Sequence, residues 1–271
     1  MGLGDPGTVI AVDAGCRWGL PPGWEELGNA LVYFGFDPDH DECTRLNALL
    51  GHSSTVREFV PIALAATAGR RKVHVTREPA CSSFYPPVPG IADEFPTLDA
   101  VSLAHTVIVT CTRLDMWAGQ RGLPRIDVVK LDTQGSELEI LEGAGTLLES
   151  ISVIDTEVEF NPIYEGQPLF GDVDRFLREA GFVLWRLSNL VHYRRRGVGP
   201  DHTGPDHHAF DHDNVEFTRR GGQLYWGHAL FVRDDVVRGR ADQATQKRVI
   251  RFALTTGLTD LAATIRRNSP Q

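Results

Sequence analysis

Residues 126–145 constrain the fold most, because the spacing of the apolar residues changes part-way along this stretch. Residues 126–131 are a short apolar run rich in β-branched side chains, which is typical of a strand buried on both faces of a sheet. After Gly135 the apolar residues recur every three or four positions, as on the inward face of a helix. A strand, a tight turn and a helix form the crossover unit of a parallel α/β sheet. Ligands of such sheets bind at the carboxyl ends of the strands, where Asp132 falls.

Four motifs in and after this stretch carry a resemblance to a known family. They are K-L-D-T-Q-G-S-E at 130–137, L-E-G-A at 141–144, V-I-D-T-E-V-E-F at 153–160 and F-L-R-E-A-G-F at 176–182. In this order they resemble the FkbM family of S-adenosylmethionine-dependent methyltransferases, and a weaker likeness extends over residues 8–235. The resemblance implies a Rossmann-like class I methyltransferase, with a mostly parallel sheet flanked by helices and an antiparallel last strand. It also implies methyl transfer to an oxygen, on a sugar or polyketide hydroxyl in natural-product biosynthesis.

A second buried strand, residues 8–13, leads into a loop of the nucleotide-binding type. Glycine lets the backbone of such a loop turn sharply and approach a ligand. The dinucleotide fingerprint G-x-G-x-x-G would need a glycine where Arg17 stands, so NAD is disfavoured. S-adenosylmethionine has no phosphate and is compatible with this loop. The residues expected to bind the cofactor here are Asp13, Gly15, Cys16 and Gly19; the family usually has Ala-Asn directly after the first glycine.

The next strand, residues 30–36, ends at Asp37 and Pro38. Asp37 lies about twenty residues after the first glycine, where an acidic side chain can accept hydrogen bonds from both ribose hydroxyls. The family usually has Glu-Pro at this place. It also packs adenine near the end of the following strand, 57–64, which adds Ala63 to the expected cofactor site. The alternative is that Gly15 and Asp37 are a plain strand turn and a helix N-cap.

Acidic side chains gather on the strand expected over residues 152–160. Glu157 and Glu159 are two apart and share one face of a strand, and Asp132 should lie at the tip of the neighbouring strand. Either one carboxylate takes the proton of the acceptor, or the cluster binds a divalent cation that lowers the pKa of the hydroxyl. We favour direct proton transfer, because nothing in the sequence requires a metal. The candidate catalytic residues are Asp132, Glu157, Glu159 and Lys130; alternatively, a glutamate pairs with Lys130 or an arginine and only holds loops together.

The other segments of the chain are expected to form helices, strands and one serine-rich loop. Asp115 is expected to cap a short helix rather than to contact a ligand, and Asp172 to cap another. The stretch Cys81–Phe84 resembles a serine-rich loop near the family's active site, or is an ordinary polar loop. The expected elements are a helix over 39–50, a hairpin or edge excursion over 69–84, an edge strand over 107–112, a helix over 172–180, a strand over 182–187 and an antiparallel last strand over 223–233.

Residues 197–213 are rich in glycine, proline and histidine. We interpret them as a lid over the acceptor, with metal binding or substrate contact by the histidines as the alternative. Residues 1–235 are expected to form the methyltransferase domain. Residues 236–271 are expected to form a helical extension that packs on this domain or on a partner chain, so a homodimer is possible.

The charge and the composition of the chain limit the kinds of molecule it is expected to bind. The 271 residues carry a net charge of −9, and no basic run exceeds 194–196, so we expect a small-molecule acceptor and no nucleic acid. No apolar run approaches the length of a membrane span and no targeting segment is evident, which indicates a cytoplasmic protein with no membrane contact. Two other functions remain open. They are a nicotinamide-dependent oxidoreductase and a non-catalytic ligand-binding module of the same fold.

Overall fold

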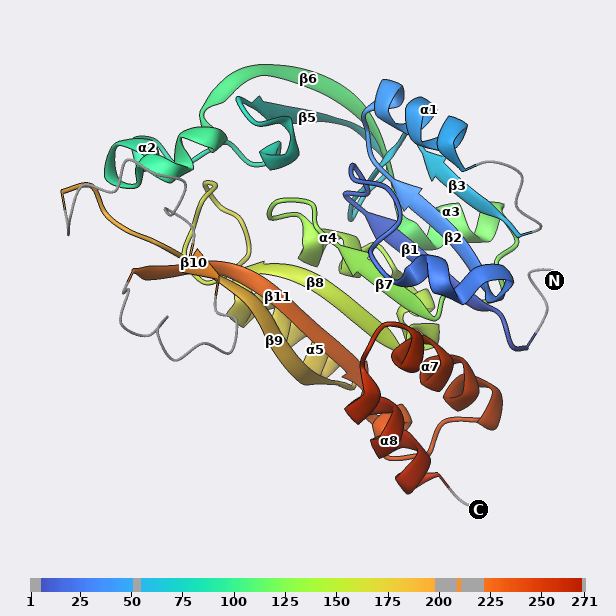
Figure 1. The fold of residues 1–271 in the computed structure, drawn as a ribbon. Coiled ribbons are helices and arrows are strands. Elements are labelled where there is room, and N and C mark those ends of the chain that lie inside the picture. The colour runs from blue at the N-terminus through green and yellow to red at the C-terminus, as the bar shows by residue number, and fades with distance from the viewer. Residues whose placement is uncertain (1–5, 51–54, 198–208, 211–221, 270–271) are drawn as a thin grey trace.

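A mostly parallel sheet forms the centre of the molecule. The structure, a computed structural model, describes residues 6–50, 55–197, 209–210 and 222–269. Its main sheet has eight strands in the order β10-β9-β11-β8-β7-β1-β2-β3 (Figure 1). The strands are β1 (Val9–Ala14), β2 (Leu31–Phe36), β3 (Arg57–Val60), β7 (Val128–Leu131), β8 (Val153–Glu159), β9 (Phe182–Tyr193), β10 (Ala209–Phe210) and β11 (Gln223–Arg233). Neighbours from β3 to β8 are parallel, and β11 is antiparallel to β8 and β9. The predicted Rossmann-like fold with an antiparallel last strand is confirmed.

Alternate residues of the central strands enter two hydrophobic clusters, one on each face of the sheet. In β1, Ile10 and Val12 belong to the first cluster, whereas Val9 and Ala11 belong to the second. All four side chains are fully buried, and burial of one such aliphatic side chain stabilises the fold by about 1.5–3 kcal/mol. The central strands are therefore buried on both faces, as the apolar run over 126–131 predicted.

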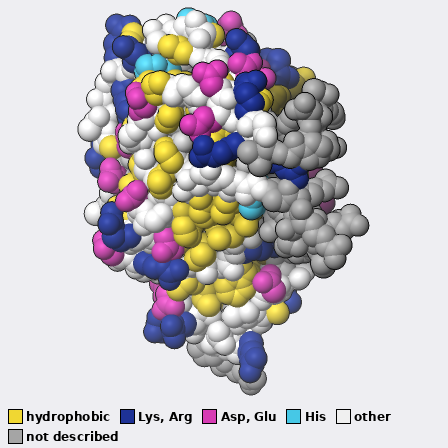
Figure 2. All heavy atoms as spheres, turned by 90° about the vertical axis from the view of Figure 1, so that its left-hand side faces the viewer, with side chains coloured by type: hydrophobic (Ala, Val, Ile, Leu, Met, Phe, Trp, Pro, Cys, Tyr) yellow, Lys and Arg dark blue, Asp and Glu magenta, His cyan; other side chains and the backbone are white. Residues whose placement is uncertain are grey.

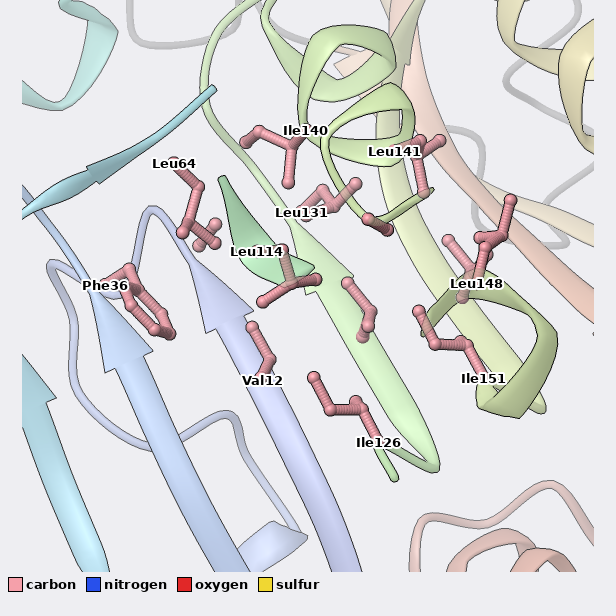
Figure 3. Close-up of a cluster of buried hydrophobic side chains, with 14 of the residues drawn as sticks. Val12, Phe36, Leu64, Leu114, Ile126, Leu131, Ile140, Leu141, Leu148 and Ile151 are labelled. Atoms are coloured by element: carbon pink, nitrogen blue, oxygen red, sulfur yellow. The ribbon is translucent and has the colours of Figure 1, made fainter. Parts of the chain in front are cut away.

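The helices divide between these two faces. The first cluster, shown in Figure 3, is covered by α3 (Leu114–Gln120), α4 (Glu137–Glu142), the 3-10 helix η4 (Gly145–Ser150) and α5 (Phe170–Glu179). The second is covered by the 3-10 helix η1 (Trp24–Ala30), α1 (His40–Leu49), α6 (Asp234–Val237), α7 (Gln243–Thr255) and α8 (Thr259–Asn268). Residues 236–267 are mostly helical, as predicted, and their apolar side chains complete the second cluster.

A second, three-stranded sheet has the order β4-β6-β5. Its strands are β4 (Ala63–Leu64), β5 (Gly69–Thr76) and β6 (Leu103–Thr112). In Figure 1, β5 and β6 extend as a curved pair from the region of α1 toward α2 (Ile91–Glu94), at the opposite end of the main sheet from α7 and α8. A short 3-10 helix, η2 (Pro79–Cys81), follows β5, and another, η3 (Pro96–Val101), precedes β6.

Several predicted boundaries are wrong for local reasons. The single strand expected over 57–64 is two strands in different sheets, because Pro61 lies between β3 and β4 and has no amide to continue a ladder. The strand expected over 107–112 begins at Leu103 and is the middle strand of its sheet, not an edge. The crossover helix α4 ends at Glu142 and is followed by η4, and Gly143 between them lets the backbone approach Ala65, whose carbonyl oxygen would lie 2.4 Å from a Cβ at this position.

Two predicted helix caps are also wrong. Helix α5 begins at Phe170 with Leu169 as its N-cap, and the Asp172 carboxylate accepts a hydrogen bond from the Leu169 amide at 3.1 Å. The cap of α3 is Arg113, and Asp115 in its first turn accepts from the Met116 amide and pairs with Arg113. In both helices the acidic residue supports the first turn from inside the helix.

Figure 2 shows the side of the molecule that lies on the left in Figure 1. Charged side chains of both signs are interspersed over it, and apolar side chains gather near its centre. The predicted lid, residues 197–213, lies outside the described residues except for Gly197 and β10. No helix in the described ranges combines the length and the apolar composition that a membrane span requires.

Candidate active site

A cavity of about 450 Å³ lies between the carboxyl ends of the main-sheet strands and the second sheet. Its floor is formed by residues that follow β1, β2 and β7, among them Gly15, Asp37 and Asp132. Its roof comes from β5, β6 and the loop after β5. Of the expected cofactor and catalytic residues, Gly15, Asp37, Pro38, Ala63 and Asp132 line this cavity, whereas Asp13, Cys16, Gly19, Lys130, Glu157 and Glu159 do not.

Gly15 brings the loop after β1 into contact with the end of β7. Its φ of +83° lies in the left-handed region, and a Cβ at this position would lie 1.8 Å from the Asp132 carbonyl oxygen. The Gly15 amide donates to the Phe36 carbonyl at 2.9 Å, which ties the same loop to the end of β2. Only glycine fits this point, where three strand ends meet. The resulting narrow backbone cradle fits S-adenosylmethionine, the cofactor that the family resemblance implied.

Asp37 is buried at the end of β2 and lines the cavity. Burial raises the pKa of its carboxyl group, although the Asp39 amide donates to it at 2.8 Å and Arg17 lies nearby. The N-cap of α1 is Asp39, which accepts from the Asp41 and Glu42 amides. The alternative in which Asp37 is only a helix N-cap is therefore wrong.

Lys130 lies between two carboxylates on adjacent strands. Its Nζ is 3.4 Å from Asp13 Oδ1 and 3.5 Å from Asp132 Oδ2. Burial lowers the pKa of Lys130, but these carboxylates and Asp155 outweigh it, so the pKa is raised and the ammonium stays charged. Burial raises the pKa of Asp13 to about 6, opposed by Lys130 and by the Tyr33 hydroxyl, which donates at 2.9 Å.

Asp132 and Glu157 share the side chain of Gln134 but differ in the direction of their pKa shifts. Gln134 Nε2 donates to Glu157 Oε2 at 2.6 Å and lies 3.4 Å from Asp132 Oδ1. Burial would raise the pKa of Asp132, but a third of this side chain is exposed to the cavity, and Lys130 and His228 hold the pKa below its usual value. Burial, followed by the charge of Asp132, raises the pKa of Glu157 well above its usual value. A proton held by this pair is therefore favoured on Glu157 over Asp132.

Glu159 is the last residue of β8, two positions after Glu157 on the same face, and is also buried. Burial and the charge of Glu137 raise its pKa well above the usual value. The ion pairs of Lys130 in the described ranges are with Asp13 and Asp132 and not with a glutamate of β8. Across the same ranges, no three His, Cys, Asp or Glu side chains are arranged to hold a metal ion.

A family model described as the methyltransferase FkbM domain matches residues 19–184, more than half of the chain. The chain belongs to the FkbM methyltransferase family. The predicted family, the methyltransferase activity and S-adenosylmethionine as the cofactor are confirmed, and the oxidoreductase and the non-catalytic module are not favoured.

This FkbM methyltransferase is similar in sequence to one curated protein and in structure to one solved enzyme. It is 28% identical over 203 residues to "2-O-methyltransferase NoeI" of Sinorhizobium fredii (strain NBRC 101917 / NGR234), covering 69% of this chain and 83% of that protein. It is also similar to the crystal structure of magnesium protoporphyrin IX methyltransferase (ChlM) from Synechocystis PCC 6803 with bound SAM, at 12% identity and a TM-score of 0.41. That match covers 85% of this chain and 73% of the other.

Sequence reasoning missed Gln134, the residue that joins the two carboxylates of this FkbM methyltransferase. Its φ of +59° is in the left-handed region, which a non-glycine residue adopts only with support from its surroundings. Ser83 Oγ donates to its carbonyl oxygen at 2.6 Å, and the Tyr164 hydroxyl lies 3.1 Å from its Oε1. The one available signal was its place in the tight turn before Gly135. The contact from Ser83, which lines the cavity, places the serine-rich loop at the site and not at a remote surface.

Two further side chains support this centre. Glu137 closes the turn after β7, because its Oε1 accepts from the Thr133 amide at 2.6 Å and its Oε2 from the Gly135 amide at 2.9 Å. His228 on β11 lies 3.5 Å from Asp155, and its pKa is raised because this carboxylate outweighs the effect of burial. The sequence placed His228 in the last strand but could not show that this strand lies directly beside β8.

Proposed function

We propose that this FkbM methyltransferase transfers the methyl group of S-adenosylmethionine to a hydroxyl oxygen of a small molecule, with Asp132 as the base. The observation that carries the proposal is the state of Asp132, which is ionised, partly exposed to the cavity and 3.5 Å from Lys130. The name of the relative NoeI, a 2-O-methyltransferase, supports oxygen as the accepting atom.

The floor of the cavity supports the proposed cofactor contacts. The backbone at Gly15 can approach the ligand closely, and Asp37 can accept hydrogen bonds from the two ribose hydroxyls. Ala63 and Pro38 add apolar surface for the adenine side of the ligand. When bound, S-adenosylmethionine supplies a methyl group on a sulfonium, which is already activated for attack. Asp13, Cys16 and Gly19 support the loop from behind the cavity wall.

The remaining task is alignment of the acceptor and removal of its proton, because a neutral hydroxyl is a poor nucleophile. Asp132 accepts this proton as the oxygen attacks, and Lys130 keeps Asp132 ionised beforehand. Gln134 holds both carboxyl groups in place, with its Nε2 2.6 Å from Glu157 Oε2 and 3.4 Å from Asp132 Oδ1. Direct transfer to Asp132 requires no divalent cation.

The test compares Asp132→Asn with Glu159→Gln. The first removes the base, and kcat should fall about 10²- to 10⁴-fold while the Kd for S-adenosylhomocysteine, measured by calorimetry, changes little. The second places an isosteric amide at a buried carboxyl group that does not line the cavity, so kcat should stay within a few-fold of the wild type. Full activity of Asp132→Asn would refute the base assignment. Loss of activity in EDTA that magnesium restores would favour a metal-bound alkoxide instead.

A further inference from the structure

The roof of the cavity carries four valines on one face of β5 and β6. Val73 pairs with Val107 in the antiparallel register, and residues directly opposite each other project to the same side. Val75 and Val109 lie two positions away on their strands and therefore share this face. All four line the cavity. We call these four residues the valine face.

The opposite face of the same two strands is different in character. It carries the pairs Arg70 with Thr110, Lys72 with Ile108 and His74 with Thr106, and beyond a bulge Thr76 pairs with Leu103, so polar residues predominate on it. An antiparallel sheet with one solvated face shows this alternation, and its apolar face normally packs on a core. Here the apolar face looks into the cavity, where Val73 is 7% exposed and packed but Val107 remains 38% exposed. The fold itself therefore leaves Val107 partly uncovered.

Polar side chains beside the valine face are already engaged. Ser82 Oγ accepts from the Thr76 amide at 3.3 Å. Ser83 Oγ donates to the Gln134 carbonyl and accepts from the Tyr85 amide at 3.0 Å. A free sugar needs several hydrogen-bonding partners around its ring, because buried hydroxyls without partners are costly. The roof instead offers hydrocarbon.

Charge near the roof is also neutralised within the protein. The Arg71 guanidinium lies 4.1 Å above the ring of Phe84 and forms an ion pair with Glu139. Glu139 also accepts from the Tyr85 hydroxyl at 2.5 Å. His105, opposite Val75, is the polar residue that this face adds to the cavity. The roof therefore has no strong charge left to recognise an ionic group.

We propose that the valine face binds an apolar segment of the methyl acceptor. The acceptor is then an amphipathic alcohol, in which the reacting hydroxyl is joined to a hydrocarbon segment, and not a free sugar. This inference rests on the proposed function, which places the hydroxyl at Asp132 on the floor opposite the roof. Each methylene group buried against the valine face should strengthen binding about fourfold.

The experiment uses two glycosides of the same sugar as probes, the methyl and the octyl glucoside, the latter below its micelle concentration. Binding to the full chain is measured by calorimetry in the presence of S-adenosylhomocysteine. The octyl glucoside should bind at least tenfold more tightly than the methyl glucoside. In the double variant Val73→Thr, Val107→Thr this preference should fall below threefold, whereas Ile108→Thr on the opposite face, 53% exposed, should keep it.

Three outcomes would overturn the inference. Equal binding of the two glucosides, or no saturable binding of the octyl glucoside, would show that the roof does not recognise hydrocarbon. Weaker binding of S-adenosylhomocysteine by the double variant would assign the valine face to the cofactor. The proposed function fails separately: Asp132→Asn should still bind the octyl glucoside, so a defect in methyl transfer alone concerns the base and not the roof.

Discussion

The floor of the cavity is held by backbone contacts and ion pairs, whereas its roof is an apolar sheet face. The floor is made of strand ends with a backbone contact at Gly15 and buried charges around Lys130, so nearly every group there has a fixed partner. The roof is a three-stranded sheet whose apolar face lines the cavity, with Val107 38% exposed. A floor of this kind suits one invariant ligand, the cofactor, whereas a roof of this kind suits an acceptor recognised through hydrocarbon.

The largest expected effect is at the tightest point of the floor. Gly15→Ala should abolish measurable binding of S-adenosylhomocysteine, a loss of more than about 100-fold, because the new Cβ would collide with the Asp132 carbonyl and push β1 and β7 apart. The matched control is Gly166→Ala, at a φ of +77° but with open space around the position. It carries a similar backbone strain of about 1–2 kcal/mol and should keep its affinity. Normal binding by Gly15→Ala would show that the floor is not rigid.

The buried charges of the floor give the second effect, which depends on pH. Asp13 has a pKa of about 6 in the folded protein against a usual value of 3.8, so the folded state binds the extra proton between these values. Stability is therefore highest below pH 4 with respect to this group and is lost as the pH rises through 6. A shift of this size corresponds to about 3 kcal/mol.

Asp13→Asn should remove this dependence. The wild type should lose up to about 3 kcal/mol of its free energy of unfolding between pH 4 and pH 7 through Asp13. The variant should not show this loss, because its amide is neutral at every pH, and urea unfolding measures both. Asp99→Asn, on an exposed residue outside the site, serves as the control and should follow the wild-type curve closely. Parallel curves for Asp13→Asn and the wild type would mean that Asp13 is not destabilised by its burial.

The floor could be predicted further from the sequence than the roof. Asp132, Gly15 and Asp37 follow strands of one parallel sheet, and the carboxyl ends of such strands meet at one edge whatever the register. The partner of Lys130 could not be predicted, because the pairing with Asp13 depends on the register of β1 against β7. Gln134 was missed because its left-handed backbone depends on a hydrogen bond from Ser83, which is distant in the sequence.

The valine face was missed for a related reason. Its halves lie on strands separated by two 3-10 helices and α2, and Val73 meets Val107 only through the pairing of β5 with β6. The sequence showed an apolar run over 107–112 but not which of its faces would look into a cavity. A strand packed on a core and a strand that lines a binding site have the same alternation of apolar and polar residues.

The smallest expected effect is on the free energy of unfolding, when a valine is replaced by threonine once in the floor and once in the roof. Val129→Thr, in β7 of the floor, places a hydroxyl in a fully buried position and should lower the free energy of unfolding by about 1–3 kcal/mol. Val107→Thr, in the roof, places the same hydroxyl where water already reaches the side chain, so the change should stay within about 0.5 kcal/mol. Urea unfolding of the two variants without ligand measures both values. Equal losses would mean that the valine face packs as a core and is not open to an acceptor, whereas the expected difference would show that any binding defect of the roof variants does not arise from unfolding.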